Sequence, residues 1–359
     1  MRYKIFTAAF LLLCLIPSVG MLVLPPTQPA ANEHLSPVPQ LRLADGRWNA
    51  AVLDQVTAYL ADHFAFRQEL VTANAWLHAG LLASAPIEDV IVGEQGWLYY
   101  ARTLDDYQRR ATLSDDELHT IAQTVAQMQA YCAARGARFV FTIAPNKNSL
   151  YPAQMPARYL RGAGESNAQR LTPLLAQYGV HYVDLFAAFA AQQEVLYYPT
   201  DSHWTERGAA LVHDWLMDAL DLPHTAFADA PYTTARTHRG DLYEMLYPKG
   251  RARDVQQQYD LDFSYVAPPR TAQDILIETT SPTAPNGRLL LCRDSFGNAL
   301  HPFLAADFRE AVITRQLPYP LEQVQAGDTV IVEIVERDLA ELLAHPPALG
   351  AADRDTEGG

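Results

Sequence analysis

An apolar stretch from Ile5 to Leu24 follows two basic residues near the start of the chain, Arg2 and Lys4. A basic segment before an apolar one is the pattern of an export signal. At about 1.5 Å per residue, this stretch is long enough to cross a bilayer as one helix. We therefore expect residues 1–24 to be an uncleaved, single-pass anchor with its basic end in the cytoplasm. A cleaved signal peptide is the alternative, and in both cases the rest of the chain lies in the periplasm or the extracellular space.

Prolines interrupt any regular period from residue 25 to residue 47, which predicts a linker. From residue 48 to residue 348, helical apolar spacing alternates with short apolar runs, and a polar tail, 349–359, follows. The short runs predict strands at 138–143, 180–184, 275–278, 288–292, 310–314 and 329–334. The helical spacing predicts helices at 54–63, 66–82, 114–135, 167–178, 205–220, 296–306 and 337–344. This alternation indicates one α/β domain with a mostly parallel sheet flanked by helices.

Three local signals refine this organisation. Two short apolar runs, Val90–Val92 and Trp97–Tyr100, flank a turn with two glycines, which predicts a hairpin. Ser114 and Glu117 form the capping box of the helix that ends before Gly136. The section from about 223 to 269 shows no regular period and is too long for an ordinary connection, so we expect a functional insertion or lid there, before the strand at 288–292.

Composition narrows the classes of function. The chain has 27 Lys plus Arg against 41 Asp plus Glu, a formal charge of −14, and a general nucleic-acid binder would need the opposite balance. Hydrophobic residues make up 49% of the chain, which is typical of a globular protein. The cysteines lack zinc-ribbon spacing, and Cys132 and Cys292 can pair only if the fold brings them together. We expect no metal site, because His213 and Asp214 have no second ligand pair at a recognised spacing.

One polar cluster, Asp201-Ser202-His203, lies just before the helix predicted from residue 205. An Asp and a His two residues apart on a loop can face one cleft. The carboxylate can then hold the imidazole while its other nitrogen acts as a base. The alternative is structural, because Asp, Ser and Thr are common residues at helix starts.

The second cluster, Arg293-Asp294-Ser295, follows an apolar strand and opens a helix. Ser295 is therefore expected at the carboxyl end of a parallel strand, where ligands bind in open α/β sheets. Backbone N–H groups at the helix start could stabilise an oxyanion, as a serine nucleophile requires. Plain helix capping is the alternative. No Gly-x-Ser-x-Gly elbow is present here, which weighs against an α/β-hydrolase.

Together these motifs resemble the AlgX/AlgJ-like family of SGNH-hydrolase-like proteins, also called DHHW-type proteins. The resemblance covers roughly residues 50 to 345 and rests on the segments 63–67, 90–99, 144–152, 201–204, 240–242, 293–296 and 336–339. It implies an SGNH-hydrolase-like fold and an Asp-His-Ser triad in which Ser295 is the nucleophile, His203 the general base and Asp201 its orienting partner. Arg293 departs from the usual Gly-Asp-Ser, and Ser202 stands where the family's nickname has a second His.

The resemblance also implies the reaction and its partners. Known relatives are extracytoplasmic O-acetyltransferases that modify alginate and related polymers, and we expect no cofactor for this chain. The acceptor would be an exported polysaccharide, and a membrane-bound acyltransferase would supply the acetyl group. The reaction would pass through an acetyl-serine intermediate.

Further candidates for substrate or oxyanion contacts come from the residues around these motifs. Asn146 and Lys147 follow a strand end and could provide polar contacts or oxyanion donors, but a plain turn is the competing and somewhat favoured interpretation. Arg293 and Arg315 join Lys147 as the cations that could hold an anionic glycan on an acidic protein. Tyr198 and Trp204, like Trp97, could stack on a sugar, although large aromatic side chains are more often core anchors.

Three functions follow from these observations. The first is an O-acetyltransferase acting on an exported polysaccharide. The second is a carbohydrate esterase or deacetylase, since the same triad can pass the acetyl group to water. The third is a non-catalytic polysaccharide-binding subunit with a degenerate triad, for which the bulky Arg293 is the main support.

Overall fold

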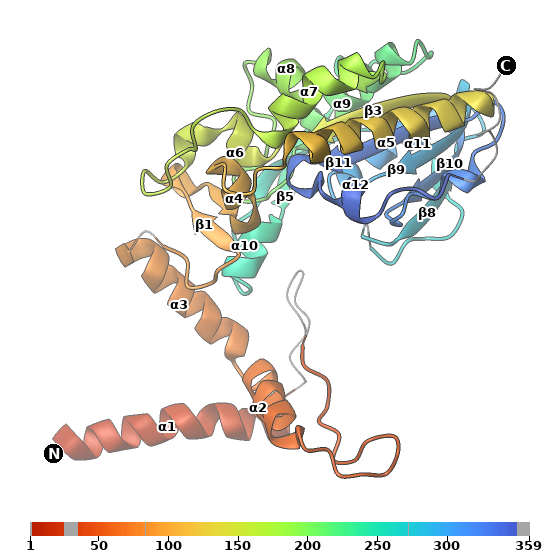
Figure 1. Cartoon of the computed structure of the whole chain (residues 1–359). Coiled ribbons are helices and arrows are strands. Elements are labelled where there is room, and N and C mark those ends of the chain that lie inside the picture. The colour runs from red at the N-terminus through yellow and green to blue at the C-terminus, as the bar shows by residue number, and fades with distance from the viewer. Residues whose placement is uncertain (1, 25–34, 83, 272, 350–359) are drawn as a thin grey trace. The chain divides into compact units, whose positions relative to one another are not determined.

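The structure is a computed structural model that describes residues 2–24, 35–82, 84–271 and 273–349 (Figure 1). Much of the predicted linker and nearly all of the predicted tail lie outside these residues. The chain divides into two compact units, one of residues 1–92 and 239–252, the other of residues 93–238 and 253–359. The domain boundaries expected from the sequence stay a prediction.

The first unit is mainly helical. Its elements are α1 (Arg2–Val23), α2 (Val52–His63), α3 (Arg67–Leu82), β1 (Val90–Val92) and α10 (Asp241–Leu246). Among the described residues, the one helix with the length and composition to cross a membrane is the stretch Tyr3–Val23. A signal sequence near an N-terminus would share these properties. The finding therefore agrees with either of the two expectations for this segment.

The second unit is built on a seven-stranded sheet in the order β4-β3-β11-β9-β10-β8-β7. Its strands are β3 (Arg138–Ala144), β4 (Tyr182–Val183), β7 (Ser264–Tyr265), β8 (Leu276–Thr280), β9 (Asn286–Cys292), β10 (Phe308–Thr314) and β11 (Thr329–Val335). The five strands from β4 to β10 run parallel, and β8 and β7 add an antiparallel edge. The central strands are almost continuously apolar because both faces of the sheet are covered.

Helices cover both faces of this sheet. On one face, α5 (Asp115–Ala134), α7 (Asn167–Gln177) and α12 (Glu341–Ala344) form one hydrophobic cluster with sheet residues such as Val330 and Val332 of β11. On the other, α9 (Glu206–Ala219) and α11 (Gly297–Asp307) pack on alternate residues such as Ile331. Figure 1 shows α5 running along the sheet. The predicted α/β class, a mostly parallel sheet flanked by helices, is thus confirmed.

Shorter elements connect these layers. They are η1 (Glu94–Gly96), β2 (Leu98–Tyr100), η2 (Ala101–Thr103), α4 (Leu104–Tyr107), α6 (Lys147–Leu150), η3 (Pro152–Gln154), α8 (Leu185–Ala190) and η4 (Leu321–Gln323). The predicted capping box is present: Glu117 N donates to Ser114 Oγ, and Ser114 N donates to the Glu117 carboxylate. The last predicted helix is shorter than expected and is preceded by η5 (Glu336–Asp338).

The section from 223 to 269 contains regular structure, so its interpretation as irregular is wrong. In it, β5 (Thr233–His238) pairs antiparallel with β6 (Asp254–Gln258). Both strands are polar on their two faces and lack the apolar alternation that marks a strand in a sequence. The pairing is set by backbone hydrogen bonds, which leave no trace in the apolar pattern.

The two described cysteine thiols, Cys132 and Cys292, are buried and free. Burial raises the pKa of the Cys132 thiol to about 12, so it stays protonated and unreactive at neutral pH. These cysteines act as small apolar residues of the core.

Candidate active site

Backbone hydrogen bonds join the two ends of the loop that carries Asp201 and His203. Tyr197 and Trp204 form an antiparallel bridge, and Tyr198 N donates to His203 O at 3.2 Å. Thr205 then caps α9 by accepting from a backbone N–H of the first turn. The loop therefore leaves a bridged pair and enters a capped helix, which limits its freedom at both ends.

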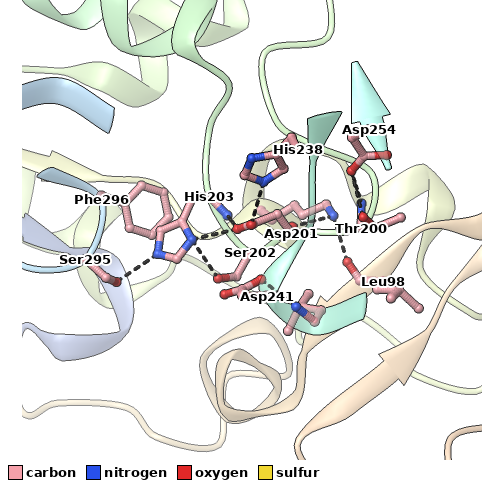
Figure 2. Close-up of polar contacts among 12 residues, drawn as sticks. Leu98, Thr200, Asp201, Ser202, His203, His238, Asp241, Asp254, Ser295 and Phe296 are labelled. Carbon is pink, nitrogen blue, oxygen red and sulfur yellow. Dashed lines mark hydrogen bonds and ion pairs between the residues drawn. The ribbon is translucent and has the colours of Figure 1, made fainter. Parts of the chain in front are cut away.

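A continuous path of hydrogen bonds joins this loop to the turn between β9 and α11 (Figure 2). His203 Nδ1 lies 2.7 Å from Asp201 Oδ1, and His203 Nε2 lies 2.8 Å from Ser295 Oγ. The backbone N–H of His203 also donates to Asp201 Oδ1, at 3.0 Å. The three residues proposed from the sequence are thus brought together, although 92 positions separate His203 from Ser295.

The charge of Asp201 is stabilised in a buried place. Its side chain is nearly inaccessible, and burial by itself opposes ionisation. The charges and hydrogen bonds of His203 and His238 outweigh burial and hold the pKa of this carboxyl well below its usual value. Asp201 is therefore an acceptor that can fix the tautomer of His203 with Nδ1 protonated, which leaves Nε2 free to accept a proton from Ser295.

The turn that presents Ser295 is tied to the end of β11. Asp294 accepts from Phe296 N at 2.8 Å and from the backbone N–H of Val335. Asp294 N in turn donates to the Glu333 carboxylate at 3.2 Å. Burial and the nearby charge of Asp294 raise the pKa of Glu333 well above its usual value, which favours the protonated form. Sequence reasoning missed Glu333, because a lone acid inside an apolar strand carries no recognisable pattern.

Arg293 is a structural residue of this turn. Its side chain is 2% exposed, and its guanidinium donates to Asn298 Oδ1 and, at 3.0 Å, to Asp294 O. A Cβ on Gly297 would meet three carbons of Arg293 at 2.6–2.9 Å, so only glycine fits beside the folded arginine. Burial lowers the pKa of Arg293 to about 10, which leaves it charged at neutral pH.

Asn146 and Lys147 are buried and engaged with the protein itself. Lys147 Nζ donates to three backbone carbonyls: Leu98 O and Pro199 O, both at 2.7 Å, and Asp201 O at 2.9 Å. Asn146 contacts two buried acids, its backbone N–H donating to Glu336 at 3.0 Å and its side chain to Asp106 at 3.1 Å. Lys147 therefore holds the loop of Asp201, a role that fits neither the expected substrate contact nor a plain turn.

The aromatic candidates are core residues. Trp204 is 1% exposed and packs against Phe296, and the centroid of the Phe296 ring lies 4.8 Å from that of the His203 ring. Tyr198 is 2% exposed and donates its hydroxyl hydrogen to Glu206. Neither ring has an open face for a sugar, and the alternative interpretation as core anchors fits their burial.

Arg315 lines a cavity, so it remains a candidate for contact with a ligand. It follows β10 and bonds to Gln273. Together with Arg293 and Asp294 it lines a cavity of about 290 Å³ at the carboxyl ends of β9 and β10. This is the edge at which ligands bind in open α/β sheets.

His238, at the end of β5, is a further residue of the site that the sequence did not predict. Its Nε2 lies 2.8 Å from Asp201 Oδ2, the carboxylate oxygen that His203 leaves open. The only available signal was the adjacent 240–242 segment, one of the motifs behind the family resemblance. His238 itself lies in the section whose strands the apolar pattern did not reveal.

A mostly parallel sheet with Asp, His and Ser gathered at its carboxyl edge defines an SGNH-hydrolase-like protein. Residues 90–314, more than half of the chain, match the family described as "SGNH hydrolase-like domain, acetyltransferase AlgX". The chain belongs to this family. Both the family resemblance and the fold predicted from it are confirmed.

Individual relatives are more distant. A probable alginate O-acetylase AlgJ from Pseudomonas syringae pv. tomato is 23% identical over 191 residues, which are 52% of this chain and 46% of that protein. The match thus spans less than half of the curated relative. Bacillus cereus PatB1 superposes with a TM-score of 0.53 and 17% identity, over 70% of this chain and 96% of PatB1. A DHHW family protein from Eubacterium siraeum gives a TM-score of 0.50 and 15% identity, over 72% and 99%. These two structures are alike in fold.

Proposed function

We propose that this protein is an extracytoplasmic O-acetyltransferase that adds acetyl groups to an exported polysaccharide. The observation that carries the proposal is the path of hydrogen bonds from Asp201 through His203 to Ser295, with lengths of 2.7 and 2.8 Å. Relatedness to O-acetyltransferases of the SGNH-like family supports acetyl transfer as the reaction. The alginate named for one relative makes a polymer of that kind the first acceptor to test.

In the proposed mechanism, Ser295 Oγ attacks the acetyl carbonyl carbon of the donor while His203 Nε2 takes the hydroxyl proton. The carbonyl oxygen gains negative charge beside the start of α11, where the helix dipole favours an anion. The donor's leaving group departs with the proton from His203, and acetyl-Ser295 remains. A sugar hydroxyl then attacks the ester, giving its proton to His203, and Ser295 Oγ regains that proton as the acetylated sugar leaves.

We further propose that α1 anchors the chain with the site on the outer side of the membrane. The length and composition of Tyr3–Val23 support this placement. A membrane-bound acyltransferase would then deliver the acetyl group from the cytoplasm, and the resemblance to alginate-type systems supports that partner. Protease added to intact spheroplasts should digest this chain and spare a cytoplasmic marker protein. Protection equal to that of the marker would contradict the proposed orientation.

The test of the nucleophile uses the full chain in detergent with a chromogenic acetyl ester as donor and an oligosaccharide as acceptor. Ser295→Ala should lower total turnover by about a thousandfold or more, because a triad without its nucleophile retains little rate. Ser264→Ala, an exposed serine on β7, is the matched control and should be unaffected. Mass spectrometry should also detect the intermediate directly. The peptide that contains Ser295 should be about 42 Da heavier than the unmodified peptide, because an acetyl group replaces a hydrogen. Undiminished turnover by Ser295→Ala would overturn the assignment.

The same experiment separates transfer from hydrolysis. Acetylated oligosaccharide is expected as a product that grows with acceptor concentration. Free acetate alone, at saturating acceptor, would instead favour an esterase. The non-catalytic alternative has lost its main support, because the Arg293 side chain folds onto Gly297 and bonds Asn298.

A further inference from the structure

Asp201 binds two imidazoles, one on each carboxylate oxygen. Oδ1 accepts from the Nδ1 side of His203 at 2.7 Å, and Oδ2 lies 2.8 Å from His238 Nε2 (Figure 2). The Asp201 side chain is almost fully buried, so its second oxygen depends on a protein donor. His238 comes from β5, whereas Asp201 and His203 share one loop. The carboxylate is therefore fixed from two separate elements.

His238 is itself firmly held. Its ring stacks on Tyr198 with a centroid distance of 3.8 Å and an interplanar angle of 5°. The Tyr198 hydroxyl donates to Glu206 at the start of α9, and Gln256 of β6 donates to the other oxygen of Glu206 at 2.8 Å. These contacts set the ring plane, and so the direction of Nε2, before any substrate is bound.

The surroundings of His238 are acidic. Within its unit, the titratable groups that face it are Asp201 and Tyr198 of the loop, Glu206 of α9 and Asp254 of β6. Burial favours the neutral ring, but the hydrogen bond to Asp201 and the three carboxylates raise the pKa of His238 above its usual value. These acidic surroundings thus favour the imidazolium form of His238.

We propose that His238 is a positioning residue of the site, which donates from Nε2 to Asp201 Oδ2 and, as an imidazolium, offsets part of the carboxylate charge that His203 experiences. This inference rests on the proposed function. Two consequences are separable. The hydrogen bond keeps Asp201, and through it His203, aligned with Ser295. The positive charge keeps the pKa of His203 lower than a lone Asp201 would, so that His203 remains a neutral base at lower pH.

Two substitutions separate these consequences. His238→Gln keeps an N–H donor for Asp201 but removes the charge, and His238→Ala removes both. The matched control is His345→Gln: His345 also lies 2.8 Å from a carboxylate, Glu341, but this pair is exposed and far along the chain. For each full-length variant, kcat/KM for the chromogenic acetyl ester is measured from pH 5 to 9, together with the unfolding midpoint.

For His238→Gln we expect the acidic limb of the profile to move up by about one pH unit, while the plateau stays within about tenfold of the parent. His238→Ala should show the same shift and a plateau lower by about a hundredfold, because Asp201 loses a buried partner. His345→Gln should leave the profile unchanged.

An acidic limb that stays in place in both His238 variants, or moves to lower pH, would overturn the proposal. A loss of rate that follows only the unfolded fraction would mean that His238 is merely structural, and would overturn it equally. Ser295→Ala is run in parallel. If Ser295→Ala keeps its activity, the proposed function itself fails. That failure can be told apart from a failure of the His238 proposal, because the Ser295→Ala result does not depend on His238.

Discussion

Lys147 offers a sharp test of how the loop of Asp201 is held. Its side chain is 4% exposed, and its ammonium donates to Leu98 O, Pro199 O and Asp201 O at 2.7, 2.7 and 2.9 Å. Lys147→Met keeps nearly the same length and removes all three donors. The ammonium also lies 4.8 Å from the Trp97 ring centroid, a contact that methionine replaces with a neutral one.

The size of the effect follows from these contacts. Pro199 O keeps a bond from Leu98 N at 2.9 Å, so the main losses fall on Leu98 O and Asp201 O. A buried acceptor that loses its donor costs about 1–3 kcal/mol, and hydrogen bonds to charged groups lie at the upper end. Methionine avoids the cost of burying an ammonium, which offsets part of the loss. We expect the free energy of unfolding to fall by about 2–4 kcal/mol.

Catalysis should fall further than stability explains. Without the hydrogen bond from Lys147 to Asp201 O, the Asp201 carboxylate can shift relative to His203. Small displacements of catalytic groups lower the rate by about a hundredfold. The measurements are urea unfolding of the full chain in detergent and kcat/KM for the acetyl ester under conditions where the variant is folded.

Lys249→Met is the matched control, because it makes the same chemical change at a half-exposed side chain whose nearest carboxylate, Glu69, is 3.9 Å away. Its unfolding free energy should stay within about 0.5 kcal/mol of the parent. If Lys147→Met and Lys249→Met unfold at the same urea concentration and turn over equally, the assigned role of Lys147 is refuted.

Two further predictions concern the nucleophile turn and a buried acid. Gly297→Ala should destabilise the protein by about 1–3 kcal/mol and abolish most ester turnover, because the new Cβ would lie within 3 Å of Arg293. The control Gly80→Ala, whose Cβ would have nothing within 4 Å, should change neither quantity. Equal unfolding midpoints for the two variants would contradict this account. Glu336 is buried beside Asp106, and burial followed by that charge raises its pKa to about 8. Its contribution to stability is therefore full below pH 4.5 and lost as pH rises through 8, so Glu336→Gln should flatten the fall in unfolding free energy across that interval. An unchanged slope in denaturant titrations at several pH values would show that Glu336 is ionised throughout.

Much of this molecule could be predicted from its sequence because the determining contacts are local. The capping box at Ser114 closes over three residues, and the strands β3 and β11 are apolar runs whose length and composition are sufficient. The Asp-x-His loop and the strand-to-helix turn of Ser295 are likewise short patterns. Each of these two patterns indicates the chemistry of its own side chains, but neither shows that the other lies beside it in the fold.

The roles of residues with ambiguous local patterns depend on the tertiary structure. Trp204 and Tyr198 are aromatic, and the choice between sugar platform and core anchor depends on which elements cover them. Lys147 follows a strand in a turn-like segment, and nothing beside it in the chain indicates that it binds carbonyls about fifty residues away on either side. Burial and long-range hydrogen bonds are properties of the packed chain, and local pattern does not encode them.

The sequence alone determined the three triad candidates, the order of the main helices and apolar strands, and the class of fold, since apolar period and helix caps act within a few residues. Tertiary structure decided the rest. It brings Asp201, His203 and Ser295 together at one edge of the sheet, and it places His238, 37 residues away in the chain, in a hydrogen bond with the second carboxylate oxygen of Asp201. Its strand, β5, is polar on both faces and is stabilised by pairing with β6. Such a strand exists only where a partner supplies its hydrogen bonds, so its presence and its histidine follow from the assembled fold.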